Sequence, residues 1–274
     1  MDNATQIFLT IFYMQLFILL RCGKGREEHN SELVISPAKL KKSGWKPGNN
    51  TYLVSEKGIF CAGFYNVSPN SYAFAVWYAN DPQRTVAWMA NRDDLVGYNS
   101  SLTLKNENLV ISDSQAQVVW SVTINPSKGA DVGMGLVLLD SGNLMFNSTN
   151  KNRVWKSFDS PTFTLLPTQI FSENSTLVSR RNDTTYASGV YIFSASQSDT
   201  QTPSLYYNRS KLGYWSLKSI DNEAFSLGAD GYLSLGNDGK VISSSCNIKL
   251  LMASDSGDSA RPLRRLTLDH DGNL

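Results

Sequence analysis

The chain has 274 residues, of which 41% are hydrophobic, and its 25 basic and 24 acidic side chains leave a net charge of +1. This hydrophobic content is enough for a packed core, which excludes wholesale disorder, and the length allows one or two domains. The near-neutral charge gives no electrostatic argument for nucleic acid or an anionic membrane surface as a partner.

Residues 1–25 are typical of a secretory signal peptide. The apolar run IFLTIFYMQLFILL at 7–20 precedes Arg21, Cys22 and small residues. This run is too short to span a bilayer of about 30 Å, and its length suits the apolar region of a signal peptide. The preceding MDNATQ has no basic residue, so a buried helix is the alternative. No second run approaches transmembrane length, so we expect no anchor in this chain beyond the signal segment.

N-glycosylation sequons also favour a secreted glycoprotein. They occur at Asn49, Asn99, Asn147, Asn174, Asn182 and Asn208. The three cysteines define no disulfide framework, because Cys22 lies near the expected cleavage point and the other two are far apart. The pairing of Cys61 and Cys246 therefore stays open.

After the signal segment, the pattern predicts an all-β protein. Runs such as SYAFAVWYA (71–79), NLVIS (108–112) and LVLLD (136–140) are rich in β-branched, aliphatic and aromatic residues. Turns such as DSGN (140–143) and DHDG (269–272) supply the Asn, Asp and Gly that hairpins need. No window shows the 3.6-residue stripe of an amphipathic helix.

A repeat of tryptophans divides the first half of the chain. Trp88, Trp120 and Trp155 end successive units spaced by 32 and 35 residues, and we expect them to be structural core residues. Three such units suit three sheets around a shared axis better than a propeller, which needs at least four blades. Pro161 and Pro167 then indicate a connector, after which the hairpin pattern resumes.

These residues resemble a known family, the bulb-type or monocot mannose-binding lectin domain, as in the extracellular region of plant S-domain receptor-like serine/threonine kinases. The resemblance rests on GIFCAGFY (58–65), VAWMANRD (86–93), LLDSGNL (138–144) and VWKSFDSPTFTLLPTQ (154–169). Phe163 departs from the family pattern, which usually has an Asp there. The resemblance implies a β-prism of three four-stranded antiparallel sheets with pseudo-threefold symmetry over 32–162. A second lectin-like prism, incomplete at the C-terminus, would occupy 163–274.

In that family each sheet can bind mannose through Gln-x-Asp-x-Asn-x-Val-x-Tyr, whose polar groups bond the sugar hydroxyls while Val contacts the ring carbons. In the hairpin at 104–112, Asn108 and Val110 match the pattern. Leu104, Asn106 and Ser112 replace its Gln, Asp and Tyr.

The hairpin at 139–147 keeps only Asn143 of the same pattern. Leu139, Ser141, Met145 and Asn147 replace the other four residues, and a glycan on Asn147 would lie across this groove. We read Asn108 and Asn143 as hairpin-turn residues.

The first unit has Ala73, Ala75 and Trp77 at the equivalent positions and no polar set at all. We therefore expect degenerate carbohydrate sites and no measurable binding of mannose. The residues of these degenerate sites are Asn106, Asn108, Val110, Ser141 and Asn143.

No motif predicts catalysis, a metal or a cofactor, and the kinase motifs of the resembled receptors are missing. His29 and His270 have no metal-binding spacing, and DHDGN at 269–273 is read as a hairpin turn rather than a calcium loop.

The leading hypothesis is a non-enzymatic recognition module, secreted or associated with the plasma membrane as part of a longer receptor. Its partner would be a cell-wall glycan, a peptide or a receptor ectodomain, with homodimerisation as an option. The alternatives are a functional mannose-binding lectin in defence and a truncated receptor-kinase fragment without its own function.

Overall fold

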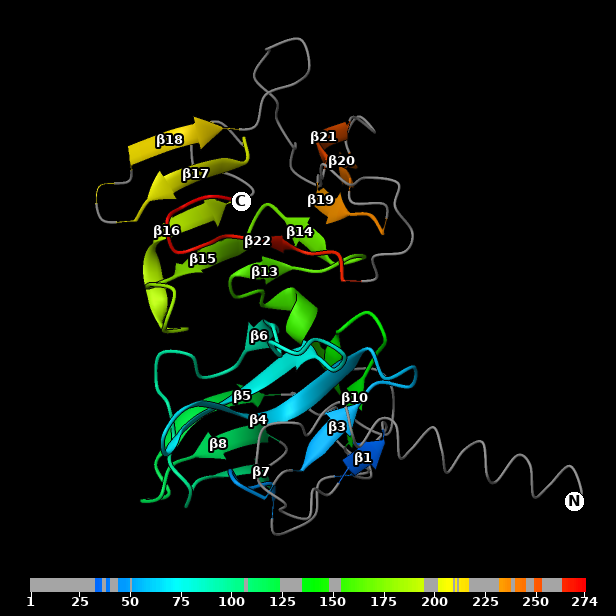
Figure 1. Cartoon of the computed structure of the whole chain (residues 1–274), viewed down its shortest axis with the longest axis vertical. Helices are drawn as coiled ribbons and strands as arrows, with labels where there is room; N and C mark the ends of the chain where they lie inside the picture. The colour runs from blue at the N-terminus through cyan, green and yellow to red at the C-terminus, as the bar shows by residue number, and fades with distance from the viewer. Residues whose placement is uncertain are drawn as a thin grey trace, which may run out of the picture. The chain divides into compact units, whose positions relative to one another are not determined.

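The structure is a computed structural model, shown in Figure 1. It describes residues 33–35, 38–39, 44–49, 51–105, 108–123, 135–147, 154–194, 202–208, 210, 212–216, 232–237, 240–244, 249–252 and 263–274. Within these ranges the chain forms strands, one short 3-10 helix at Ser157–Asp159 and no α-helix. The all-β prediction is thus confirmed. None of the described segments is a helix long and apolar enough to cross a membrane.

The chain divides into two compact units. The described residues up to Val86, together with Leu95–Trp155, form the first unit, and Ala87–Asp94 with Lys156–Leu274 form the second. The second unit therefore takes in a short segment from the first half of the sequence. The domain boundary expected between residues 162 and 163 stays a prediction.

The first unit has three sheets in its described part. One has the order β1-β3-β4-β5-β6, formed by Leu33–Ile35, Tyr52–Val54, Phe60–Ser68, Ser71–Tyr78 and Val86–Met89. Of these strands, β6 lies mostly in the segment Ala87–Asp94 that is assigned to the second unit. Another has the order β7-β8-β9, formed by Ser101–Lys105, Asn108–Ser112 and Val118–Thr123. The last has the order β12-β11-β10-β2, formed by Val154–Lys156, Leu144–Asn147, Gly135–Leu138 and Ala38–Lys39. Trp45 also bridges Leu102 at the free edge of β7.

Strand β5 is buried along nearly its whole length, because side chains cover both of its faces. On one face Phe74 contacts Trp45 and Phe64, with ring centroids 6.1 and 5.6 Å apart. The opposite face carries Ala75 and Trp77, both fully buried. This double burial explains why SYAFAVWYA is an almost unbroken apolar run rather than an alternating one.

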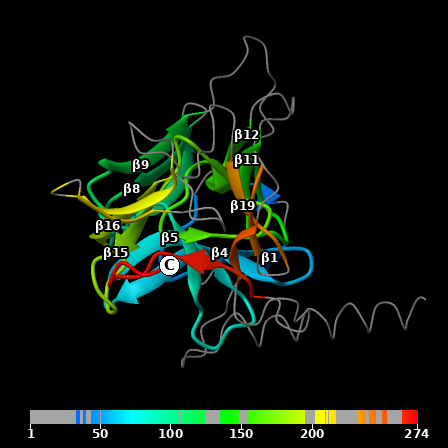
Figure 2. The ribbon, with the colours of Figure 1, turned by 90° about the horizontal axis from the view of Figure 1, so that it is seen from above.

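The second unit also has three sheets in its described part. The smallest has the order β13-β22, formed by Thr164–Leu165 and Leu266–Thr267. Another has the order β14-β19-β20-β21, formed by Ile170–Ser172, Tyr232–Leu235, Lys240–Ser243 and Lys249–Met252. The last has the order β15-β16-β17-β18, formed by Thr176–Arg180, Ser188–Ser194, Ser204–Tyr207 and Leu212–Ser216. Strands β15 and β16 lie side by side in Figures 1 and 2 and pair antiparallel. Phe171 and Phe193 stack at 5.2 Å in the core of this unit.

The two stretches LLDSGNL and TLDHDGNL form the same kind of turn, one in each unit. In the first, the N–H of Leu139 donates to the carbonyl of Asn143, and Gly142 has a φ of 84°. In the second, the N–H of Asp269 donates to the carbonyl of Asn273, and Gly272 has a φ of 88°. Glycine suits this left-handed position because it has no Cβ. A turn does form at 269–273, whereas no described strand follows it, so the hairpin itself stays a prediction.

Candidate carbohydrate-binding site

The β7–β8 hairpin keeps two residues of the sugar-binding pattern on one face. The register pairs Asn108 with Lys105 and Val110 with Thr103, so these four side chains share a face. Leu104 pairs with Leu109 and points to the opposite face, so it does not lie beside Asn108. Asn106 lies outside the described residues.

On this face the amide oxygen of Asn108 is buried without a hydrogen-bond partner in the described structure. Val110 beside it is 4% exposed. Across the strand, Lys105 offers only N–H donors, so it does not replace the carboxylate acceptor of the pattern. Among its described residues, the face retains one amide and an apolar side chain and has no carboxylate acceptor.

The β10–β11 hairpin is more apolar still. Asn143 is 8% exposed, and its N–H donates to the hydroxyl of Ser141 over 3.4 Å. Val137 lies opposite Met145 on the same face as Asn143. The side chain of Asn147 is outside the described part. Ser141 and Asn143 thus stabilise the turn, and the strand residues Val137 and Met145 next to it are apolar.

The first sheet has a cation where the family would bind sugar. Trp77 is fully buried on the face that also carries Ala73 and Ala75. The guanidinium of Arg84 lies 5.0 Å from the centroid of the Trp77 ring and 5.0 Å from that of the Tyr65 ring. The face is therefore an arginine-aromatic cluster, which we define as Tyr65, Trp77 and Arg84.

Backbone geometry is constrained around this cluster. A Cβ on Gly63 would lie 2.8 Å from the Thr51 carbonyl oxygen, which is too close, and 3.5 Å from the Trp77 ring, which is an ordinary contact, so the backbone rather than the indole requires glycine here. Arg84 sits in the loop after β5 with a φ of 51°, a conformation that costs a non-glycine residue about 1–2 kcal/mol. Asp81 stabilises that loop by accepting hydrogen bonds from the N–H groups of Gln83 and Thr85.

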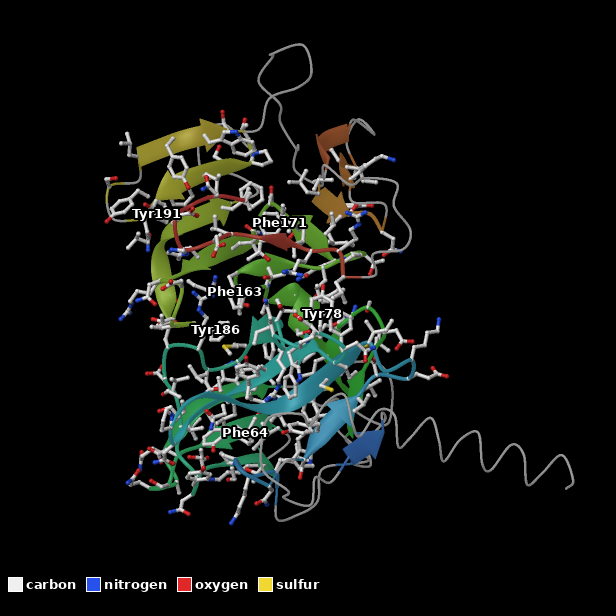
Figure 3. The ribbon with its side chains drawn as sticks, viewed as in Figure 1. Phe64, Tyr78, Phe163, Phe171, Tyr186 and Tyr191 are labelled. Carbon is white, nitrogen blue, oxygen red and sulfur yellow. The ribbon has the colours of Figure 1, made fainter. Side chains whose placement is uncertain are left out.

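The sequence NRD at 91–93 has a structural role in the second unit. Buried Arg92 donates to the carbonyls of Val178 and Ser179 over 3.0 and 2.5 Å, and lies 5.4 Å from the ring of Phe163. Burial lowers the pKa of Arg92 to about 10. Phe163, which stands where the family usually has an Asp, thus contacts Arg92 with an aromatic ring rather than a carboxylate. Figure 3 shows Phe163 near Tyr186, with ring centroids 5.8 Å apart.

Asp93 connects the NRD segment at 91–93 to strand β16. Its two carboxylate oxygens accept hydrogen bonds of 2.6 Å from the N–H and the hydroxyl of Ser188. Burial alone would raise the pKa of Asp93, but these hydrogen bonds and the charge of Arg92 lower it overall. The loop is therefore fixed by polar contacts rather than arranged around a ligand.

The tryptophans of the repeat fall in both units. Trp88 is 6% exposed and donates its indole N–H to the carbonyl of Ser160 over 2.9 Å. Trp120 and Trp155 are half-buried and meet edge to face, 5.7 Å apart. Their geometry is that of packing residues.

The predicted glycosylation sites lie mostly on the surface. Exposed sequon asparagines are Asn49, Asn99, Asn174 and Asn208. Asn182 is half-buried, and its amide oxygen accepts hydrogen bonds from Thr184 and Thr185. Cys61 is disulfide-bonded, whereas Cys22 and Cys246 lie outside the described ranges. Within those ranges, no three His, Cys, Asp or Glu residues gather as metal ligands.

Sequence reasoning missed Arg84 and the packing role of Arg92. The motif containing Arg92 was used only as a sign of family resemblance. For Arg84, the one available signal was its place after Asp81-Pro82, where a turn begins and a charged residue has no obvious role.

Comparison with known proteins decides the family. Residues 85–186 match the family model described as D-mannose binding lectin. The chain carries a bulb-type lectin domain. The match begins inside the predicted lectin domain and extends past its predicted end, so it does not define the boundary. The resemblance seen in the sequence is confirmed.

Relatives of this lectin chain are plant receptor kinases. A receptor protein kinase of Zea mays, ZmPK1, is 36% identical over 237 residues, which cover 81% of this chain and 28% of the maize protein. The G-type lectin S-receptor-like serine/threonine-protein kinase LECRK2 of Oryza sativa subsp. japonica is 29% identical over 98% of this chain and 32% of its own length. Receptor-like serine/threonine-protein kinase SD1-7 of Arabidopsis thaliana is 39% identical over 43% of this chain and 14% of its own.

The lectin chain thus spans about a third or less of these relatives. Among solved structures, BamB from Moraxella catarrhalis aligns over 85% of this chain and 75% of its own, with a TM-score of 0.19 and 13% identity. That likeness is too weak to support an argument about fold.

Proposed function

We propose that this chain is a non-catalytic extracellular recognition module in which the lectin fold has lost its mannose chemistry. The proposal includes the finer architecture, a prism of three sheets over 32–162 and a second lectin-like prism over 163–274. The three sheets found among the described residues of each unit support it. The preferred partner is a cell-wall glycan, and a peptide or receptor ectodomain remains the next choice.

The observation that carries the proposal is the face shared by Asn108 and Val110. Thr103 and Lys105 lie opposite these residues, and neither supplies the carboxylate of the family pattern. Each hydrogen bond missing from a sugar complex forfeits about 0.5–1.5 kcal/mol, and more for a charged acceptor. Because a single sugar ring makes few contacts, this loss is expected to abolish measurable mannose binding.

An extracellular setting has three supports. Cys61 is disulfide-bonded, as is common in oxidising compartments. Four sequon asparagines are exposed. The relatives are named as receptor kinases, and receptor recognition domains face outward. We therefore propose that the chain is secreted, or displayed at the plasma membrane when it forms part of a longer receptor.

One observation favours a second candidate, a functional mannose-binding lectin. The amide oxygen of Asn108 is buried without a partner, and a sugar hydroxyl is one donor that would satisfy it. This residual acceptor makes the β7–β8 face the place to test.

The test is a titration of the isotope-labelled secreted chain with methyl α-mannoside at millimolar concentrations. We expect no shift of the amide resonances of Asn108 and Val110, and the same spectra with methyl β-galactoside as control sugar. Shifts specific to mannoside that disappear in Asn108→Ala would contradict the proposal and establish the second candidate. A thermal scan of the same sample separates both from a fragment without function, which would show no cooperative unfolding.

A further inference from the structure

The arginine-aromatic cluster of Tyr65, Trp77 and Arg84 has a cation with no counter-ion among the residues that the structure describes. Arg84 is half-buried, and its guanidinium makes no hydrogen bond or ion pair with the described residues. Its recorded contacts are the two rings and a backbone hydrogen bond to Asp81. Since burial of a charge is costly, an unpaired arginine at this position needs a reason beyond folding.

Two N–H donors in the cluster lack acceptors. The Nε of Arg84 is buried without a hydrogen-bond partner in the described part of the chain, and so is the indole nitrogen of Trp77. Trp77 is fully buried, and its ring centroid lies 5.0 Å from the carbon of that same guanidinium. Buried donors are nearly always satisfied in proteins, so two unsatisfied donors on adjoining side chains indicate a missing acceptor.

The backbone also favours a role for the Arg84 side chain. Its φ of 51° is the left-handed conformation that glycine or asparagine adopts most easily. An arginine at such a position is strained, and strain of this kind concentrates at binding sites. The two rings lie 5.0 Å from the guanidinium carbon and restrict where the side chain can go, which lowers the entropy cost of binding an anion.

We propose that Tyr65, Trp77 and Arg84 form a binding site for the carboxylate of an acidic sugar, a uronate. The carboxylate would accept paired hydrogen bonds from the planar edge of Arg84, the geometry in which arginine binds carboxylates most strongly. The half-buried ring of Tyr65 would contact the sugar carbons. This inference rests on the proposed function, because it names the ligand class of the recognition module.

An acidic sugar fits the cluster better than an acidic peptide. Acidic peptide motifs are usually read by clusters of arginines, and this cluster has a single cation. A uronate needs one cation for each ring, and its remaining surface is the mixture of hydroxyls and C–H groups that aromatic side chains contact.

The experiment is calorimetric titration of the full secreted chain with sodium galacturonate at low ionic strength. Galactose, which has the same ring without the carboxylate, is the neutral control, and acetate and a Glu-containing tripeptide are the further controls. We expect galacturonate to bind with a Kd on the order of millimolar and the three controls to bind about tenfold or more weakly.

Variants locate the site. Arg84→Gln removes the charge, and Arg84→Lys keeps the charge but loses the planar edge, so both are expected to lower galacturonate affinity about tenfold. Lys46→Gln removes one positive charge at an exposed position elsewhere in the same unit and is expected to bind as the parent does. If both Arg84 variants fail to fold, the indole N–H resonance of Trp77 in the parent chain must shift on addition of galacturonate.

Equal binding of galactose, acetate or the tripeptide would overturn the acidic-sugar proposal, as would undiminished binding by folded Arg84 variants. The two proposals fail in different ways. Absence of both mannoside and galacturonate binding would contradict only the present inference, whereas mannoside binding would contradict the proposed function.

Discussion

The two units bury their strands differently. In the first, β5 is buried at all but its first residue, so side chains cover both faces of the sheet. In the second, strands such as β14, β15 and β19 alternate between buried and more exposed residues, so each has one core face. Strand β18 is exposed along its whole length.

Polar contacts add to the packing of these strands in the second unit. Buried Arg92 bonds two carbonyls, and Arg180 forms an ion pair of 2.7 Å with Asp269. The hydroxyl of Tyr214 also donates to the carbonyl of Gly272 over 2.7 Å. The first sheet of the other unit relies instead on aromatic contacts. A sheet covered on both faces gains stability from packing, while a sheet with one core face depends more on loops that are held by hydrogen bonds and ion pairs.

The largest effects are expected from deleting core rings. Phe74→Ala in the first unit and Phe171→Ala in the second each remove a fully buried ring and should cost about 3–5 kcal/mol. We expect the greater loss at Phe74, because a site covered on both sides collapses less easily around a cavity. Denaturant unfolding measures both values.

Leu212→Ala, at a 69% exposed position, is the control and should change stability by less than about 0.5 kcal/mol. Equal losses at the two rings would remove this distinction between the cores.

The next largest effect tests whether the hydrogen bonds of Arg92 stabilise the second unit. Arg92→Met keeps most of the side-chain volume but leaves the carbonyls of Val178 and Ser179 without a donor, which should cost roughly 2–4 kcal/mol. Arg181→Met, at an exposed position of the same unit, is the matched control and should be nearly neutral. A neutral Arg92→Met, measured by denaturant unfolding, would show that the loop needs no polar attachment.

Local features of the fold were predictable from the sequence, and distant ones were not. The turns at Gly142 and Gly272 follow from glycine and its neighbours, so short stretches predict them. The Arg92 contacts join residues 86 and 87 positions apart, which no local pattern encodes.

The candidate sites show the same limit. The spacing predicts Leu104 in the sugar groove, but the strand register puts it on the opposite face from Asn108. The cluster around Arg84 depends on the register that pairs Cys61 with Trp77 and Tyr65 with Ala73. Register is a property of the folded sheet, and a one-residue change would send these side chains to opposite faces.

A smaller effect compares the two equivalent turns. Gly142→Ala forces an alanine into a φ of 84°, at a cost of about 1–2 kcal/mol. Gly272→Ala adds a second penalty, because its Cβ would lie 2.7 Å from the Tyr214 hydroxyl and 2.8 Å from the Tyr191 ring. Thermal unfolding should therefore show the larger decrease for Gly272→Ala. The reverse order would mean that the tyrosines move aside without cost.

The smallest effect concerns acid stability of the Arg180–Asp269 pair. The hydrogen bond from Arg180 lowers the pKa of Asp269 below its ordinary value of 3.8. A carboxyl with a depressed folded pKa stabilises the protein fully above its unfolded pKa, and this contribution is lost as the pH falls through the folded value. Because the Asp269 side chain is 47% exposed, solvent screening limits the contribution to below about 1 kcal/mol.

Asp269→Asn should therefore be less stable than the parent at pH 7 and equal to it once the pH is well below 3.8. Denaturant unfolding across this range tests the expectation, with Asp159→Asn, at an exposed position, as a control that should parallel the parent. A difference that persists unchanged into strong acid would assign the loss to the turn at 269–273 rather than to the ion pair.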